Sequence, residues 1–190
     1  MYASRIALVL IGLVAFSSSV PAKEKKPLVT RDRVQLNLAG AETVLEAAKK
    51  KAATLGLKCN IAIVDDGGHV LAFARMDGAR PASAATALTK AVSAATFRQE
   101  TGPLPAKGEP DVLLSLSIQT ASGGKITTLK GGVPIVIDGQ VVGAIGVGGG
   151  TGEQDAEVAK AGIQAILDDL AEKKRPATRP ANAKSSSLLD

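Results

Sequence analysis

Aromatic residues make up only 2 % of this 190-residue chain, and tryptophan is absent. Proteins that bind single-stranded nucleic acids stack bases on aromatic side chains, so this class of function is disfavoured even though the net charge is +5. The single cysteine, Cys59, excludes a disulfide within the chain, and we expect it to be a small buried residue of a strand. The single histidine, His69, excludes a zinc site built from several histidine and cysteine ligands.

The chain is instead rich in small and aliphatic residues. Hydrophobic residues make up 45 % of the sequence and glycine contributes 20 residues. A core made of alanine, valine, isoleucine and leucine, with many glycines, favours close packing of helices on a sheet. The length allows one domain of ordinary size with additional segments at its ends.

The N-terminus has the pattern of a secretory signal peptide. Arg5 precedes the apolar stretch 6–16, and small residues follow up to Ala22. The apolar stretch is short for a membrane span, which needs about 20 residues, although an uncleaved anchor is the alternative. We therefore predict a signal peptide over 1–22, a charged leader over 23–35, and an exported protein that is periplasmic or secreted.

Two hairpins form the predicted sheet. The first runs from Ile61 to Ala79, with its turn at 65–68, and the second runs from Val133 to Gly150 around Asp138-Gly139. Asp-Gly between two apolar runs is a strong hairpin signal, because glycine adopts positive φ angles without steric cost. The remaining chain is expected to pack against this sheet.

Three helices are expected around the sheet. The first has apolar residues at steps of three and four from Leu38 to Leu55, with Asn37 as its N-cap. The second covers 84–97, with Ser83 as its N-cap. The third follows Thr151 and ends near Glu172.

Three further segments complete this outline. Thr151 and Gln154 form a capping-box pattern at the start of the last helix. The segment 103–124 is broken by proline and glycine, contains one short apolar helix at most, and suits either a flexible lid or an oligomer contact. The tail 173–190 is basic and polar, and we expect it to be disordered.

The second hairpin ends in the glycine run Gly148, Gly149 and Gly150, directly before the last helix. Backbone N–H groups at a helix N-terminus can hold an anion, whereas the alternative is a tight corner packed on a neighbour. Lys90 is either an exposed lysine or a cation directed at an acidic ligand or partner. Arg75 and Asp77 offer both charges where the first hairpin ends, and together these residues are the predicted ligand-binding set.

Metal and haem chemistry have few candidates. His69 is expected to be a surface turn residue, yet it is the one imidazole that could bind haem iron, and Met76 and Cys59 are the other soft ligands. Asp65, Asp66 and Asp77 could hold a hard cation, although aspartate is more often a turn former. The sequence shows no catalytic constellation.

Two motif blocks carry a resemblance to a known family. IVDDGGHVLAFARMDGA and GGVPIVIDGQVVGAIGVGGGTGEQDAEVAKAG resemble the GlcG/HbpS family, which includes the C-terminal domain of PduO-type proteins. The resemblance covers roughly 36–170 and implies a domain over 36–172. It implies an α/β (α+β) fold, a profilin-like three-layer α/β/α arrangement whose antiparallel sheet has roughly five strands.

The resemblance also implies a homo-oligomer, from dimer to octamer, and haem or another tetrapyrrole as a ligand. One exported branch of the family is linked to a sensor kinase or redox partner. In haem-binding members the iron ligand is a histidine near the start of the first helix, and the corresponding stretch 31–41 has none.

Three functions therefore follow as hypotheses. The first is an exported, oligomeric protein that binds a small ligand. The second is an enzyme or accessory subunit acting on small oxygenated metabolites, and the third is a structural or regulatory oligomer without a ligand.

Overall fold

The computed structural model describes residues 29–30, 33–105 and 107–174. The fold described below is that of the unit that begins at Val34. The predicted signal peptide, most of the leader and residues 175–190 of the tail lie outside the described residues and stay predictions, whereas residues 173 and 174 belong to the last helix. In the described part, no helix is long and apolar enough to cross a membrane.

Four strands form one antiparallel sheet: β1 (Asn60–Asp65), β2 (Val70–Arg75), β3 (Gly132–Ile137) and β4 (Gln140–Gly148). Their spatial order is β2-β1-β4-β3, so β1 and β4 form the centre and bring the two predicted hairpins together. Pairing of Asn60 with Gly148 sets the register at one end of the sheet. The described part of the chain thus has four strands in its sheet where the resemblance implied about five.

Local turn chemistry closes both hairpins. Oδ1 of Asp65 accepts hydrogen bonds from the backbone N–H groups of Gly67 (2.9 Å) and His69 (2.8 Å). In the second turn Asp138 has a φ of 48° and Gly139 a φ of 74°. Positive φ angles at both central residues match the right-handed twist of the flanking strands, which is why Asp-Gly is found there.

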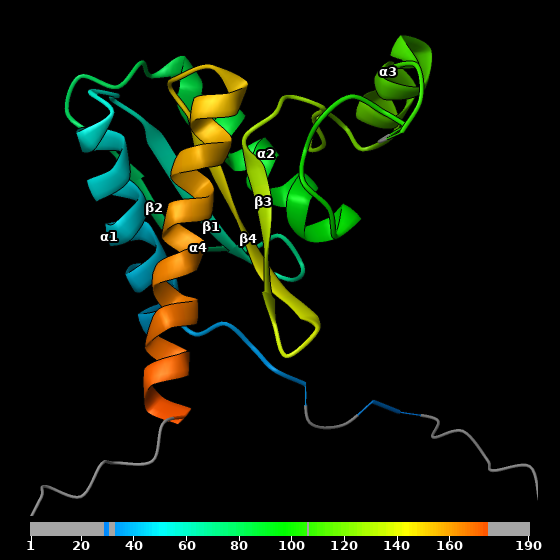
Figure 1. The fold of residues 1–190 in the computed structure, drawn as a ribbon. Coiled ribbons are helices and arrows are strands. Elements are labelled where there is room, and N and C mark those ends of the chain that lie inside the picture. The colour runs from blue at the N-terminus through cyan, green and yellow to red at the C-terminus, as the bar shows by residue number, and fades with distance from the viewer. Residues whose placement is uncertain (1–28, 31–32, 106, 175–190) are drawn as a thin grey trace, which may run out of the picture. The chain divides into compact units, whose positions relative to one another are not determined.

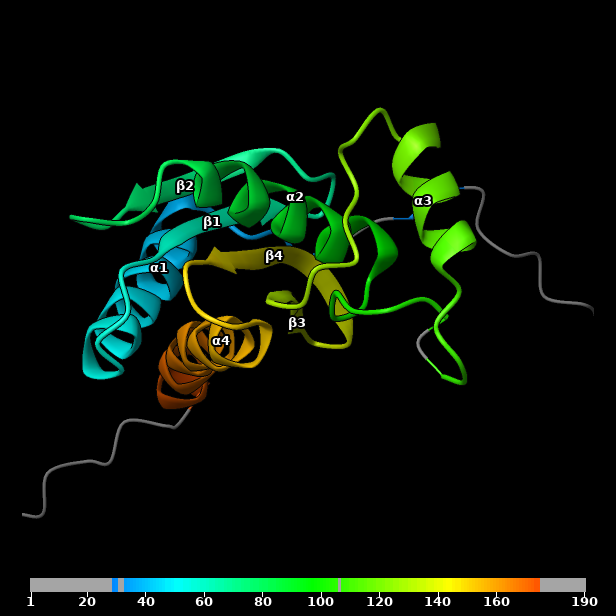
Figure 2. The same cartoon turned by 90° about the horizontal axis from the view of Figure 1, so that it is seen from above.

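Helices cover both faces of the sheet (Figure 2). α1 (Leu38–Thr54) and α4 (Gly152–Lys174) pack side by side on one face, and α2 (Ala82–Phe97) lies on the other. The expected α/β/α architecture is confirmed.

The helix caps were only partly predicted. Asn37 caps α1, since its Oδ1 accepts from the N–H of Gly40 at 2.9 Å. The capping box of α4 is present, with the Thr151 N–H donating to Oε1 of Gln154 and the Gln154 N–H donating to Oγ1 of Thr151. The predicted N-cap at Ser83 is wrong: α2 begins at Ala82 after Pro81, so Ser83 lies within its first turn, where it is buried.

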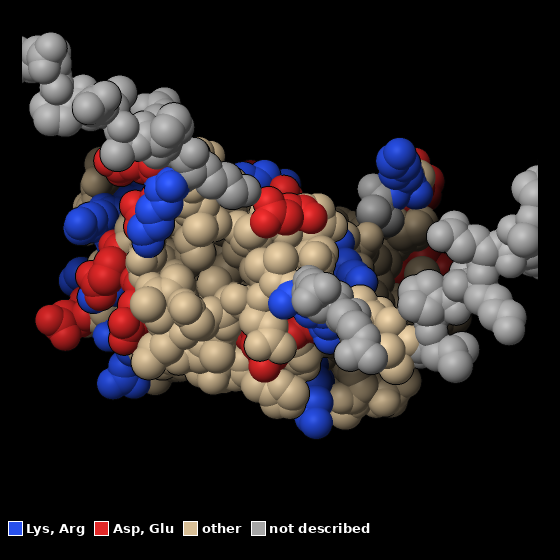
Figure 3. All heavy atoms as spheres, turned by 90° about the horizontal axis from the view of Figure 1, so that it is seen from below, with Lys and Arg blue, Asp and Glu red and all other residues tan. Residues whose placement is uncertain are grey.

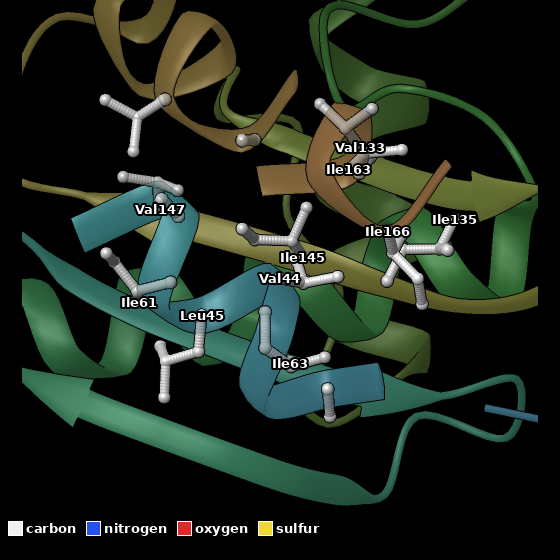
Figure 4. Packing of buried hydrophobic residues seen from close by; sticks show 14 of the residues in the cluster. Val44, Leu45, Ile61, Ile63, Val133, Ile135, Ile145, Val147, Ile163 and Ile166 are labelled. Atoms are coloured by element: carbon white, nitrogen blue, oxygen red, sulfur yellow. The ribbon is translucent and has the colours of Figure 1, made fainter. Parts of the chain in front are cut away.

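The larger core lies between the sheet and the helices α1 and α4 (Figure 4). Isoleucine and valine fill it, among them Val44 from α1, Ile61 and Ile145 from the central strands, and Ile163 from α4. All four side chains are at most 9 % exposed. Branched aliphatic residues fill this layer without the aromatic rings that the sequence lacks.

The core on the opposite face is built from much smaller side chains. Ala87, Ala91 and Ala94 of α2 pack against Ala62, Val64 and Ala144 of the sheet. A Cβ added at Gly146 would meet the backbone of Ala87 and Ala91. Glycine in β4 therefore allows α2 to approach the sheet backbone directly.

A fourth helix, α3 (Val112–Ala121), lies away from the layered body in both ribbon views (Figures 1 and 2). Asp111 caps it by accepting from the Leu114 N–H at 2.8 Å, and none of its residues is buried. The expected short helix is confirmed, and most of its apolar side chains are exposed.

The charges on the face shown in Figure 3 are mixed. Basic and acidic side chains alternate at its edges, and uncharged residues occupy most of its middle. Among the described residues visible there, no broad basic surface suited to a polyanion is formed.

Candidate functional site

Lys90 is a buried lysine. Its residue is 5 % exposed, its Nζ donates to the Val147 carbonyl at 2.8 Å, and it forms an ion pair with Oδ2 of Asp155 at 2.8 Å. The expectation of an exposed lysine is therefore wrong. The acid that Lys90 contacts belongs to the same chain, so the alternative, a cation directed at an acidic ligand or partner, stays a prediction.

Asp155 lies in the first turn of α4, on the far side of the sheet from α2, and is 2 % exposed. The two side chains meet where β4 ends, because Lys90 reaches past Val147. Gly131 leaves them room: a Cβ there would lie 2.6 Å from Cβ of Asp155 and 3.0 Å from Nζ of Lys90. The pair thus connects the two helical layers.

The sequence reading missed Asp155. The available signal was an acidic residue in the first turn of a helix, placed directly after a glycine run, where the helix dipole favours a negative charge. Its second oxygen, Oδ1, accepts from the Gly150 N–H at 2.9 Å. A carboxylate of the chain itself therefore occupies part of the predicted anion site.

The glycine run serves mainly to pack this corner. A Cβ at Gly148 would lie 2.8 Å from the Ser83 carbonyl oxygen, and one at Gly149 would lie 2.7 Å from the Lys58 carbonyl oxygen. The N–H of Gly150 is bonded to Asp155, and that of Thr151 is bonded within the capping box. These two backbone N–H groups are therefore already occupied by acceptors of the chain itself.

A cavity of about 710 Å³ opens at this corner. Its charged lining residues are the basic Arg80, Lys90 and Lys130 and the acidic Glu153 and Asp155. Lys130 and Glu153 form an exposed ion pair at 3.1 Å, and the hydrogen bond from Lys130 lowers the pKa of Glu153. Three positive charges against two negative ones, beside the N-terminus of α4, make the cavity suited to a small anion. We call it the Lys90 cavity.

The other predicted ligand residues lie elsewhere. Arg75, Met76 and Asp77 line a separate open cavity of about 610 Å³, together with Lys49 and Lys58. The predicted set is thus divided: Lys90 and the glycine run share one cavity, and Arg75 and Asp77 belong to another. Binding at either place stays a prediction.

His69 lies at the turn between β1 and β2, where its side chain is 84 % exposed. Its Nδ1 is 3.3 Å from both carboxylate oxygens of Asp65. Partial burial acts to raise the pKa of Asp65, but hydrogen bonds from the backbone and ring of His69 and from Gly67 outweigh it, and the pKa is lowered. The expectation of a surface turn residue is confirmed.

The soft side chains do not come together in one place, and haem binding by His69 or Met76 stays a prediction. His69 and Met76 are at different places, and Cys59 is completely buried. Burial, with a smaller contribution from Asp155 that Lys90 opposes, raises the pKa of Cys59 to about 11, so it is a thiol rather than a thiolate. The described residues also contain no group of three or more histidine, cysteine or acidic side chains that could hold a metal ion.

Comparison with known proteins gives the family. Residues 36–164 match the family model described as haem degrading protein HbpS-like. The chain belongs to the HbpS-like family. Protein GlcG of Escherichia coli is 40 % identical over 117 residues, which cover 62 % of this chain and 84 % of GlcG. A 15.0 kDa protein from the dhaT-dhaS intergenic region of Citrobacter freundii is 34 % identical over 133 residues, covering 70 % of this chain and 93 % of that protein.

Solved structures share the fold of this HbpS-like chain. The Klebsiella pneumoniae protein ORFY aligns with a TM-score of 0.64 at 32 % identity, covering 75 % of this chain and 98 % of ORFY. PduOC, solved as a heme complex, aligns with a TM-score of 0.63 at 30 % identity, covering 70 % of this chain and 95 % of PduOC. The structure of HbpS aligns with a TM-score of 0.61 at 28 % identity, covering 75 % of this chain and 97 % of HbpS. These matches support the family assignment and the predicted architecture.

Proposed function

We propose that this HbpS-like chain is an exported, homo-oligomeric protein that binds a small organic anion in the Lys90 cavity. The observation that carries the proposal is the buried Lys90–Asp155 pair in the cavity wall. Carbonyl and carboxylate oxygens fix the ammonium at 2.8 Å each, so its position does not depend on a ligand. A fixed cation beside an open volume is a preorganised binding feature.

The charge balance of the cavity defines the ligand class. The lining carries one more positive charge than negative charges, which favours a monoanion or a dianion of modest size. An ammonium has three N–H donors, and the two described hydrogen bonds of Lys90 leave one for a ligand oxygen. Arg80 and Lys130 supply further donors in the same lining.

Isothermal titration with succinate as the probe tests this proposal, using the chain that begins at Lys23. Lys130→Gln removes a positive charge from the cavity, so the affinity should fall several-fold. Glu153→Gln releases Lys130 from its partner at 3.1 Å, so the affinity should rise. Lys160→Gln is the matched control, since Lys160 pairs with Glu100 at 2.9 Å on the surface and does not line the cavity.

We expect the affinity for succinate to change in opposite directions in Lys130→Gln and Glu153→Gln. Native mass spectrometry of the protein from its own host adds an independent reading, because it reports any retained ligand and the mass of the oligomer together. A protein without a retained ligand that also fails to bind succinate and other small carboxylates would refute anion binding at this cavity.

Haem is the second candidate ligand, supported by the HbpS-like family description and by the similarity to PduOC, which was solved as a heme complex. Haem carries carboxylate groups that the Lys90 cavity suits, whereas the described soft side chains His69, Met76 and Cys59 do not line that cavity. We therefore expect a haem titration of His69→Ala to give the same Soret band as the wild type. A Soret shift that disappears in His69→Ala would assign the iron to that side chain and contradict this view.

Export and partners complete the proposal. The signal peptide predicted over 1–22 supports a periplasmic or secreted location, and fractionation of the host with detection of the mature N-terminus tests it. A sensor kinase or redox partner, and an activity on small oxygenated metabolites, stay hypotheses from the family resemblance.

A further inference from the structure

The helix α3 exposes apolar side chains that a soluble domain normally covers. Val112 is 69 % exposed, Leu113 75 % and Leu116 54 %, and no residue of the helix is buried. Figures 1 and 2 both show the helix standing away from the sheet and from the other helices. The apolar surface of α3 is therefore unpartnered in the single chain.

Such a helix is not stable by itself. It has ten residues, and isolated helices shorter than about 12–15 residues are marginal in water. Its sequence, VLLSLSIQTA, has no charged residue, and its leucines do not fall on one face. A helix that is apolar on several sides is stabilised by contacts on several sides, so its partner must be apolar as well.

The chain itself offers a matching apolar surface. Beside α3 lies a hollow of about 380 Å³ whose apolar lining comes from Pro103, Pro110, Val112, Leu116 and Leu129. From α3, the hollow is lined by positions 112, 115, 116 and 119, which form one helical face. Leu113 does not belong to that face. One copy thus presents both a protruding leucine and a hollow that can receive it.

A two-fold pair of copies uses both features at once. In such a pair the same surface is present on both sides, so the Leu113 of each copy can enter the hollow of the other. Val112, Leu113, Leu114, Leu116 and Leu129 are between 39 % and 75 % exposed, which corresponds to roughly 500 Å² of accessible surface per copy, so that complete covering of these residues in both copies would reach the roughly 1,000 Å² that a specific interface needs. The absence of charge on α3 removes the repulsion that two identical charged helices would have.

We propose that α3 docks on a second copy of this chain with Leu113 seated in the hollow, and that this contact sets the wall of the Lys90 cavity. The link is structural: Pro103, Thr128 and Leu129 line both the hollow and the Lys90 cavity. Occupation of the hollow therefore holds these three residues from one side, while their other side lines the Lys90 cavity. The second half of this proposal rests on the proposed anion-binding function, and the docking itself does not.

Sedimentation of the chain from Lys23 onward tests the docking. The wild type should be a dimer or larger, and Leu113→Glu should dissociate at the same protein concentration because it brings a charge into an apolar contact. Leu113→Ala should weaken association by about tenfold, as expected for a central interface side chain, without adding a charge. Val70→Glu is the control, since Val70 is 54 % exposed on β2 and does not line the hollow.

Three outcomes would overturn the docking. They are a monomeric wild type, a Leu113→Glu variant that keeps the wild-type mass, and dissociation by Val70→Glu to the same extent as by Leu113→Glu. If the wild type is monomeric while its α3 amides still exchange slowly with deuterium, another partner or another part of the chain covers the helix. The circular dichroism of each variant shows whether the domain remains folded.

Succinate titration then tests the coupling to the cavity. We expect the affinity of Leu113→Glu for succinate to be about tenfold weaker than that of the wild type, and the wild-type affinity to fall when the protein is diluted below the dissociation constant of the oligomer. Equal affinity in the monomer and the oligomer would overturn the coupling and leave the docking intact. If succinate binds to neither form, the proposed anion binding fails, while sedimentation still decides the docking.

Discussion

Removing the charge of Lys90 should destabilise the domain far more than removing an exposed lysine. Lys90→Met keeps a side chain of similar length but deletes the ammonium that lies 2.8 Å from Asp155. Asp155, which is 2 % exposed, would then hold its charge with one described hydrogen bond, from Gly150. Removing one partner of a buried ion pair typically costs about 3–5 kcal/mol.

This cost is a large fraction of the stability of an ordinary domain, which is about 5–15 kcal/mol. Because the free energy of unfolding falls by about 1–3 kcal/mol for each molar of urea, the midpoint of urea unfolding should fall by about 2 M. Lys160→Met is the control, because Lys160 pairs with Glu100 at a similar 2.9 Å while both side chains are about half exposed. Exposed pairs contribute at most about 1 kcal/mol, so the control midpoint should barely move.

The double variant Lys90→Met/Asp155→Asn measures how strongly the two side chains interact with each other. Asparagine keeps an acceptor for the Gly150 N–H but carries no charge, so the double variant should be more stable than Lys90→Met alone, and the coupling energy should exceed about 1 kcal/mol. Urea unfolding followed by circular dichroism measures all four proteins. Additive effects of the two substitutions, or a Lys90→Met cost no larger than that of the exposed control, would refute the description of a buried, interacting pair.

Three other predictions follow from single sites. Gly146→Ala should lower the stability by about 1–3 kcal/mol, because its Cβ would press on the backbone of α2, whereas Gly102→Ala, with open space around it, should be neutral in the same urea titration. Cys59, with a pKa raised to about 11, should resist a thiol reagent at neutral pH until urea unfolds the chain, and rapid labelling of the folded protein would contradict its burial. Because the pKa of Asp65 is lowered in the folded protein, its charged form stabilises the fold at pH values above the unfolded pKa of about 3.9, and this stabilisation is lost as the pH falls through the folded pKa. Asp65→Asn should therefore lower the free energy of unfolding by less than about 1 kcal/mol at neutral pH and leave it unchanged in acid.

The parts of the fold that depend on neighbouring residues were predictable from the sequence. Both Asp-Gly turns, the Asn37 cap and the Thr151–Gln154 capping box are made by groups within a few positions of one another. Short stretches of sequence are therefore enough to predict these turns and caps. That the two hairpins share one sheet was also predicted, because two apolar hairpins in one small domain bury their surfaces best in a common sheet, but the pairing of β1 with β4 was not.

The site was predicted less well because its decisive contacts are distant in the sequence. Lys90 and Asp155 are 65 positions apart, and a helical pattern alone gives no sign that a lysine will be buried. Arg75 and Gly148 both pair with Asn60, from opposite sides, so two strand spacings of about 4.8 Å separate their backbones. Sequence motifs placed them in one site, whereas the sheet places them at different cavities.

The buried pair has a consequence beyond stability. An apolar pair of similar volume is often as stable as a buried ion pair, so packing alone does not account for a lysine and an aspartate at this position. What the charged pair provides is an ammonium held by Val147 and Asp155 from two sides, next to an open volume. Glycine at position 131 is needed for that arrangement, since a Cβ there would displace both partners. The proposal of a fixed cation for a ligand rests on this geometry, and the opposite effects expected for Lys130→Gln and Glu153→Gln follow from the same charge balance.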